Sequence, residues 1–186
     1  MPSSIDSFQT ACPMISSAQL QALRARADEV TAQAIGALIS AGQTLALAES
    51  CTGGLCAALL TDVAGASAAL VSSAVVYQTR AKSSLLGLDP AFIARFGPVS
   101  EPVTRALAQA ARDKAGADLG AAITGWAGPS GGSASEPVGT AYVAIAWQGA
   151  EQLTRLWIEG DRAAVRWGAA LFAIEAIRRK ASALSR

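Results

Sequence analysis

The segment from Leu45 to Leu60 is the feature that most constrains how this chain can fold. A short apolar run, Leu45 to Ala48, ends in the polar sequence Glu-Ser-Cys-Thr-Gly-Gly, and a second apolar run follows from Leu55 to Leu60. This order predicts a buried strand, a tight turn and a helix. The first amides of that helix are expected to direct free N–H groups toward Ser50, where a nucleophile or an anion would be stabilised.

The rest of the chain continues this alternation of strands and helices. Strands are predicted at about 44–48, 70–77, 119–124, 140–147 and 152–158, and helices at about 17–40, 53–61, 80–86, 90–96, 100–115 and 162–180. Helices between the early strands indicate parallel crossovers, whereas residues 148–151 are typical of a hairpin. The predicted fold is an α/β protein, a three-layer α/β/α sandwich with a mixed, mostly parallel sheet of about five strands. We expect a single domain over 17–186, preceded by a poorly ordered tail over 1–16.

The absence of histidine from the chain excludes several kinds of active site. Neither a Ser-His-Asp triad, nor a Cys-His dyad, nor a histidine-ligated metal can be built without it. The three cysteines, Cys12, Cys51 and Cys56, form no Cys-x-x-Cys pair. Their odd number argues against a disulfide framework or a zinc site and indicates reduced thiols in a cytoplasmic protein.

Charge and hydropathy narrow the class of partner. The net charge is +1, with acids and bases mixed along the chain and no basic block that would indicate nucleic acid binding. No segment approaches the ~20 apolar residues of a membrane span, and the N-terminus lacks the pattern of a secretory signal. We therefore expect neither nucleic acid nor a membrane as a partner.

Ser50 and Lys82 are the strongest candidates for chemistry. Lys82 is one of only three lysines, and it falls in the first turn of a predicted helix, just after the strand that ends in Tyr77. The positive end of the helix and the nearby Arg80 are expected to lower the pKa of its amine. A neutral lysine can serve a serine nucleophile as its base when no histidine exists. A solvated surface lysine is an equally acceptable interpretation of the pattern.

Other polar residues allow alternatives. Ser67 and Thr124 could donate to an oxyanion or orient the base, although a hydroxyl at a loop or strand end more often bonds to backbone. Cys51 could be a nucleophile, but it ranks below Ser50 because its usual histidine partner is missing. Glu49 could cap or orient the turn.

The glycine-rich segment 125–139 is the longest predicted loop. It contains neither a P-loop nor a Gly-x-Gly-x-x-Gly motif. Its backbone amides could still surround a phosphate, and a flexible surface loop is equally acceptable. Arg162, at the start of the last helix, hints at an anionic partner.

Six motifs, taken in order along the chain, resemble those of a known family. They are Ala48-Glu49-Ser50-Cys51-Thr52-Gly53-Gly54, Tyr77 with Lys82, Gly97-Pro98-Val99-Ser100-Glu101, Ala122-Ile123-Thr124-Gly125-Trp126-Ala127-Gly128-Pro129, Pro137-Val138-Gly139-Thr140 and Gly160-Asp161-Arg162. Together they resemble the CinA C-terminal domain family, the nicotinamide mononucleotide deamidases. The resemblance extends from about Ala18 to the C-terminus.

The resemblance implies a Ser/Lys amidohydrolase that needs neither metal nor cofactor and converts nicotinamide mononucleotide to nicotinate mononucleotide and ammonia. It implies Ser50 as nucleophile, Lys82 as general base with Tyr77 assisting, Ser67 hydrogen-bonded into the site and Thr124 near the oxyanion. It also implies a dimer or larger homo-oligomer. The residues expected to contact the nucleotide are Glu49, Thr52, Gly53, Gly54, Gly125, Gly128, Gly131, Gly132 and Arg162.

The sequence also departs from the family pattern in places. Gln78-Thr79-Arg80 stands where many relatives have Ser-Asn before the lysine, Ser130 interrupts a triple glycine, and Trp126 replaces a smaller apolar residue. These departures leave two alternatives open. The chain could be a nucleotide-binding domain without catalysis, or a hydrolase of another small amide.

Overall fold

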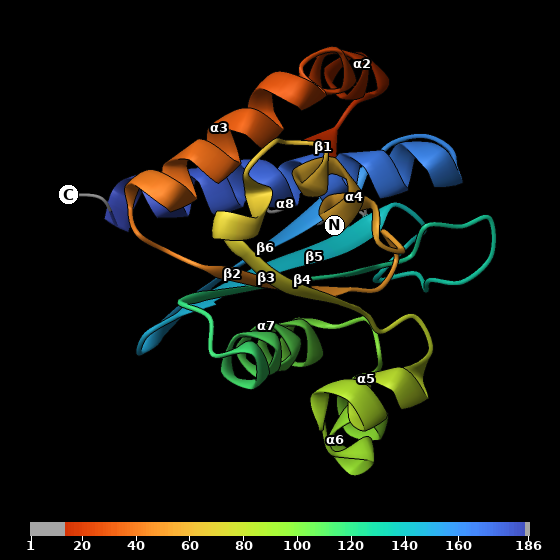
Figure 1. Cartoon of the computed structure of the whole chain (residues 1–186). Coiled ribbons are helices and arrows are strands. Elements are labelled where there is room, and N and C mark those ends of the chain that lie inside the picture. Colours follow the sequence, from red (N-terminus) through yellow and green to blue (C-terminus); the bar gives the residue numbers. More distant parts are fainter. Residues whose placement is uncertain (1–13, 185–186) are drawn as a thin grey trace.

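The computed structural model describes residues 14–184, which form one mixed sheet with helices packed on both faces (Figure 1). The strands are β1 (Met14–Ile15), β2 (Leu45–Glu49), β3 (Leu70–Val75), β4 (Leu119–Gly125), β5 (Thr140–Trp147) and β6 (Ala150–Ile158). The helices are α2 (Ser17–Ala25), α3 (Ala27–Ser40), α4 (Leu55–Thr61), α5 (Thr79–Leu86), α6 (Pro90–Phe96), α7 (Glu101–Ala115) and α8 (Arg162–Leu184), with a 3₁₀ turn, η1 (Ala66–Ala68). This layered architecture confirms the predicted fold class.

The order of the strands brings the carboxyl ends of three strands together at one end of the sheet. The order is β1-β6-β5-β4-β2-β3, with β2 parallel to both β3 and β4, and with β5 antiparallel to its neighbours β4 and β6. The carboxyl ends of β2, β3 and β4 therefore meet at the same edge. The chain passes from β2 to β3 on one side and returns to β4 on the other, which makes this edge a switch point of the kind where open α/β sheets bind ligands.

Side-chain size alternates along the central strands and sets the distance of each helical layer from the sheet. Large apolar residues of β2 and β4, such as Leu45 and Ile123, face α3, α4 and α8, whereas alanines such as Ala46 and Ala122 face α7. A Cβ added to Gly120 would lie 2.0 Å from the carbonyl oxygen of Ala108. The α7 backbone therefore packs directly on β4 and brings the start of α7 close to the end of that strand.

Two features differ from the sequence prediction at the N-terminal side. The predicted single helix over 17–40 is interrupted at Arg26, whose φ of −114° and ψ of 12° are not helical. The break lets α2 turn over α8, where the Arg24 guanidinium stacks on Trp167 at 5.1 Å. Met14–Ile15, part of the predicted tail, pairs with β6 as β1. Residues 1–13 of that tail lie outside the described residues.

No helix between residues 14 and 184 is long and apolar enough to cross a membrane. In the same part of the chain, no three Cys, Asp or Glu side chains gather in a way that could hold a metal ion.

Candidate active site

The end of β2 and the first turn of α5 bring Ser50 and Lys82 together. The Lys82 Nζ lies 3.2 Å from the Ser50 Oγ and donates to the carbonyl oxygen of Val76 at 3.0 Å. Both side chains are buried, with 1% of Lys82 and 7% of Ser50 exposed. The carbonyl of Val76, which directly follows β3, fixes the amine beside the hydroxyl. The structure thus joins the two residues that the sequence favoured for catalysis.

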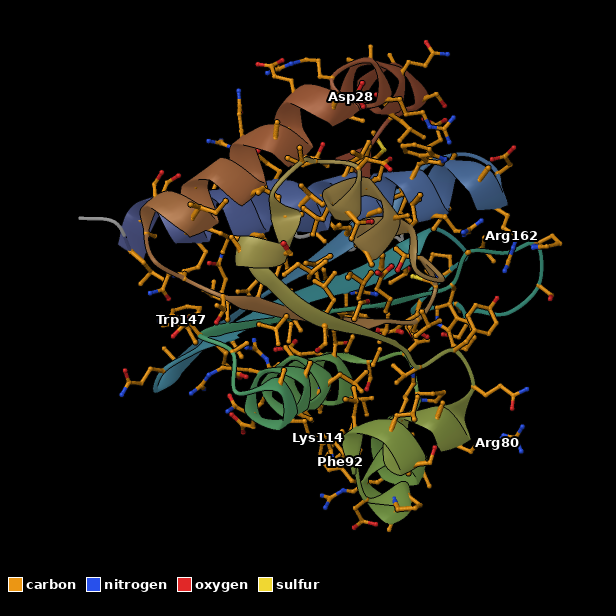
Figure 2. All side chains as sticks on the ribbon, in the orientation of Figure 1. Asp28, Arg80, Phe92, Lys114, Trp147 and Arg162 are labelled. Atoms are coloured by element: carbon orange, nitrogen blue, oxygen red, sulfur yellow. The ribbon has the colours of Figure 1, made fainter. Side chains whose placement is uncertain are left out.

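Burial lowers the pKa of the Lys82 amine to about 8, because the charged form loses its hydration. The nearby Cys51 thiol acts weakly in the opposite direction. The sequence attributed a lowered pKa to the helix end and to Arg80. Burial is the main cause instead, and the Arg80 side chain is exposed beside α5 (Figure 2). An amine with a pKa near 8 is neutral often enough at neutral pH to accept a proton.

A cavity of about 660 Å³ opens above this pair. It is lined by Ser50, Cys51, Tyr77, Gln78, Thr79, Arg80, Lys82, Pro98, Val99, Gly125, Trp126, Ala127, Gly128, Ser130 and Arg162. Three of these residues carry basic side chains, and none of them is Asp or Glu. The cavity therefore favours an anionic ligand.

Arg162 connects two walls of the cavity. Its Nη1 donates to the carbonyl oxygen of Gly128 at 2.9 Å, and its Nη2 donates to the Tyr77 hydroxyl at 2.5 Å. Tyr77 itself is 53% exposed at the mouth. Arg162 thus fixes the glycine-rich loop relative to the end of β3. Figure 2 shows Arg162 at the same end of the sheet as that loop.

Glu49 has a different role from the one expected for a residue that contacts substrate. Its buried carboxylate accepts hydrogen bonds from the amides of Gly54, Cys56 and Ala57 at 2.9–3.0 Å, and from the Ser73 hydroxyl at 3.2 Å. The N-terminus of α4 is therefore capped from inside the fold. The expectation that these amides are free to face a ligand above Ser50 is wrong, because Glu49 already occupies them.

We expect Glu49→Gln to destabilise the fold. The neutral amide offers a weaker acceptor, and its NH₂ group faces backbone donors. Loss of such buried, charge-assisted bonds costs about 2–4 kcal/mol, or roughly 5–15 °C in Tm for a domain of this size. Thermal unfolding beside the exposed control Glu159→Gln tests this. An unchanged Tm in Glu49→Gln would show that the cap contributes little.

Ser67 and Thr124 do not reach the cavity. Ser67 lies exposed in η1, just before β3, at the sheet edge opposite Ser50. Thr124 is fully buried between β4 and α7. The Thr104 hydroxyl donates to the carbonyl oxygen of Ser100 at 2.7 Å, so the Thr124 hydroxyl, 2.7 Å from the Thr104 Oγ1, must donate to it. This hydrogen bond joins α7 to β4, so the hydroxyl proton of Thr124 is not directed at the cavity.

The remaining sequence candidates divide into two groups. Gly125, Gly128 and Arg162 line the cavity, whereas the other glycines and Thr52 shape the backbone around it.

Gly53 and Gly54 have positive φ values of 63° and 94° in the turn after Ser50. Gly131 and Gly132 belong to the loop wall, where a Cβ on Gly132 would lie 2.6 Å from the carbonyl oxygen of Glu136. We assign these residues to the architecture of the site.

Several residues that the sequence interpretation did not select also shape the site. Pro98 and Val99 line the cavity from the segment before α7. The Arg166 Nε and Nη2 donate to the carbonyl oxygen of Thr52 at 3.3 and 3.0 Å, which ties the Ser50 turn to α8. The four-residue spacing from Arg162 was the available signal for Arg166, because it places both on one face of a helix.

Cys51 lines the cavity, but its thiol is poorly suited to nucleophilic attack. Burial raises the pKa of this thiol to about 12, with only small opposing effects from neighbouring amides and Lys82. A thiol with such a pKa remains protonated at neutral pH, and the thiolate is the reactive form.

Comparisons with known proteins identify the family of the chain. A family model described as the CinA C-terminal domain matches residues 27–181. The chain is 49% identical over 152 residues to a CinA-like protein of Anaeromyxobacter dehalogenans (strain 2CP-C), covering 81% of this chain and 37% of that protein. It is 48% identical over 139 residues to a CinA-like protein of Geobacter sulfurreducens, covering 75% of this chain and 34% of that protein.

Solved structures match most of the chain. A CinA superfamily protein from Klebsiella pneumoniae 700603 matches with a TM-score of 0.81 and 34% identity, covering 84% of this chain and 98% of that one. A CinA superfamily protein from Escherichia coli matches with a TM-score of 0.78 and 30% identity, covering 82% and 90%. The chain thus spans little more than a third of the curated relatives' length, but nearly all of these solved domains.

Proposed function

Because the chain belongs to the CinA C-terminal domain family, we propose that it is an amidohydrolase that converts nicotinamide mononucleotide to nicotinate mononucleotide and ammonia. The observation that carries the proposal is the 3.2 Å contact between the buried Lys82 amine and the Ser50 hydroxyl. This pair supplies a nucleophile and a base without histidine. The substrate follows from the family resemblance and is consistent with a cavity rich in basic side chains.

In the proposed reaction, neutral Lys82 takes the proton of the Ser50 hydroxyl as the oxygen attacks the carboxamide carbon. The resulting ammonium of Lys82 protonates the leaving nitrogen, the C–N bond breaks and ammonia departs, which leaves an ester on Ser50. Lys82 then takes a proton from water as the water attacks the ester. That proton returns to the Ser50 oxygen as the carboxylate product leaves.

The best candidates for stabilising the oxyanion are the backbone amides of Cys51 and Thr52. They directly follow the nucleophile, and neither donates to a backbone acceptor among residues 14–184. The amide of Ser50 itself donates to the carbonyl oxygen of Ile123 at 3.0 Å and is not free. The tie from Arg166 to the Thr52 carbonyl supports this turn from outside. Fixed donors of this kind need no reorganisation as charge develops.

The phosphate of the nucleotide is proposed to lie at the mouth of the cavity, near Arg80 and Arg162. Both residues line the cavity, together with Gly125 and Gly128. Guanidinium groups bind phosphate oxygens with paired hydrogen bonds. The volume of about 660 Å³ falls within the range of small-molecule sites, roughly 300–1,000 Å³.

The direct test is to incubate the protein with nicotinamide mononucleotide and to measure ammonia and nicotinate mononucleotide together. We expect equal amounts of both products. Free nicotinamide and a panel of small amides, assayed in parallel, distinguish a hydrolase of another amide. Calorimetric binding of the nucleotide without any product would instead indicate a binding domain that does not catalyse.

We also expect kcat/KM to rise with pH and to level off above an inflection near 8. Below the pKa of Lys82, about 8, the fraction of neutral amine falls about tenfold for each pH unit, and the rate falls with it. Steady-state assays between pH 6.5 and 9.5 measure this profile. A flat profile, or a rate that falls as pH rises through 8, would contradict the role of Lys82 as base.

A further inference from the structure

We propose that Trp126 is the aromatic platform on which the cationic pyridinium ring of the substrate rests, and that it selects N-substituted pyridinium amides over uncharged ring amides. This inference rests on the proposed function for the identity of the ligand, and it assigns a residue that sets its specificity.

Trp126 is placed firmly at the wall of the cavity. It directly follows β4, and its amide donates to the carbonyl oxygen of Thr140 at 2.9 Å, while its own carbonyl accepts from Gly139 at 2.8 Å. Its side chain is half-buried and lines the same cavity as Ser50. The Ser50 amide bonds to Ile123, three residues before Trp126. Three residues of extended strand span about 10 Å, so a ring bearing the carboxamide can contact both residues.

Gly131 supports the position of the indole. A Cβ on this glycine would lie 2.7 Å from Cε3 and 3.1 Å from Cζ3 of Trp126. The six-membered ring therefore packs against bare backbone of the glycine-rich loop. This packing fixes the ring at the wall, with the cavity beside it.

Two other tryptophans of the chain each hold a cation of the protein over the ring, whereas Trp126 does not. Trp147 holds the Lys180 Nζ 3.4 Å from its ring centroid, and Trp167 holds the guanidinium of Arg24 at 5.1 Å. Within residues 14–184, no cation of the protein stacks on Trp126. Tryptophan is the strongest partner for a cation among the aromatic residues. A cationic ligand can therefore occupy the place that Lys180 and Arg24 fill elsewhere.

The charges of the cavity specify the kind of ligand. Arg80, Lys82 and Arg162 attract an anion and repel a cation, and no carboxylate lines the cavity to hold a positive charge. The aromatic face of Trp126 is thus the group best suited to receive one. A nucleotide with a cationic ring and a phosphate matches this division, with the ring at Trp126 and the phosphate toward the guanidinium groups.

The test measures binding by calorimetry in the Ser50→Ala protein, which removes the nucleophile. The probes are nicotinamide mononucleotide and its 1,4-dihydro form, which keeps the carboxamide and phosphate but has an uncharged ring. We expect the cationic form to bind about tenfold or more tightly than the dihydro form.

Adding Trp126→Leu should remove that preference with little effect on the dihydro form, and Trp126→Phe should retain part of it. The cationic ring should also quench tryptophan emission, less so after Trp126→Leu.

The matched control is Trp147→Leu, because Trp147 lies at the opposite end of the sheet from Arg162 (Figure 2). It should leave the preference for the cationic form intact.

The proposal is overturned if Trp126→Leu weakens the binding of both probes equally, if the preference survives this substitution, or if the nucleotide does not bind. A Trp126-dependent preference without ammonia release by the unsubstituted protein would contradict only the proposed function. Ammonia release with a Trp126-independent preference would contradict only this proposal.

Discussion

Replacing Ser50 with alanine is expected to lower kcat for nicotinamide mononucleotide by at least about 10³-fold, with the binding constant changed by only a few fold. The alanine removes the atom that forms the ester, and loss of a serine nucleophile elsewhere costs up to about 10⁶ in turnover. The side chain is small and 7% exposed, so the cavity should keep its shape. Ammonia release and calorimetry with the same preparation measure the two effects.

The matched control for this prediction is Cys51→Ala. The thiol is next in sequence, lines the same cavity and is the competing nucleophile. Because burial raises its pKa to about 12, we expect Cys51→Ala to keep most of the activity. Full activity in Ser50→Ala, together with its loss in Cys51→Ala, would reverse the assignment.

Replacing Lys82 with methionine should abolish catalysis and stabilise the fold. General acid–base catalysis contributes about 10²–10⁴-fold, and methionine can neither accept nor return a proton. At the same time, the substitution removes a buried ammonium, whose pKa is lowered from 10.5 to about 8 by burial. We expect the free energy of unfolding at pH 7 to rise by about 1–3 kcal/mol.

The pH dependence of this gain follows from the two pKa values. Below pH 8 the Lys82 amine is charged in both the folded and the unfolded protein, so the folded state bears the full cost of burying this charge. Between about 8 and 10.5 the unfolded state holds more protons, and wild-type stability rises with pH. The advantage of Lys82→Met should therefore shrink through this interval. Denaturant unfolding of both proteins at pH 7 and pH 10.5 measures it, and a constant or absent difference would contradict the burial argument.

The sequence could suggest the Ser50–Lys82 pair because Ser50 directly follows β2 and Lys82 lies in the first turn of α5, the helix after β3. The apolar runs before Ser50 and before Tyr77 identify β2 and β3, and parallel neighbours end at the same edge of a sheet. The absence of histidine then reduced the choice of base. Local pattern left a solvated surface lysine as an equal alternative, and the family resemblance favoured the pairing that the structure shows.

The contacts of buried polar groups could not be predicted in this way. Glu49 caps α4 instead of contacting a ligand, because the turn folds back and brings three amides to one carboxylate. Thr124 bonds to Thr104 because α7 packs closely on β4 at Gly120. Ser67 precedes a strand rather than follows one, so it lies at the wrong edge. Each outcome depends on tertiary packing that a motif does not encode.

The break at Arg26 illustrates the same limit for secondary structure. The segment has no glycine or proline there, and its apolar spacing suits a continuous helix. The two parts separate because α2 packs its own residues on α8, including the stack of Arg24 on Trp167. Such a contact between distant segments overrides local propensity.

The most direct test of Lys82 as the base for Ser50 is a nitrogen NMR titration of the lysine side-chain amines. The chain has three lysines, Lys82, Lys114 and Lys180, and Lys82→Met identifies the signal of interest. We predict that this amine titrates near pH 8 and that its pKa shifts when Ser50 is replaced with alanine. A Lys82 amine that titrates at or above its ordinary value, 10.5, and is insensitive to Ser50→Ala would contradict the claim that it is the base for this serine.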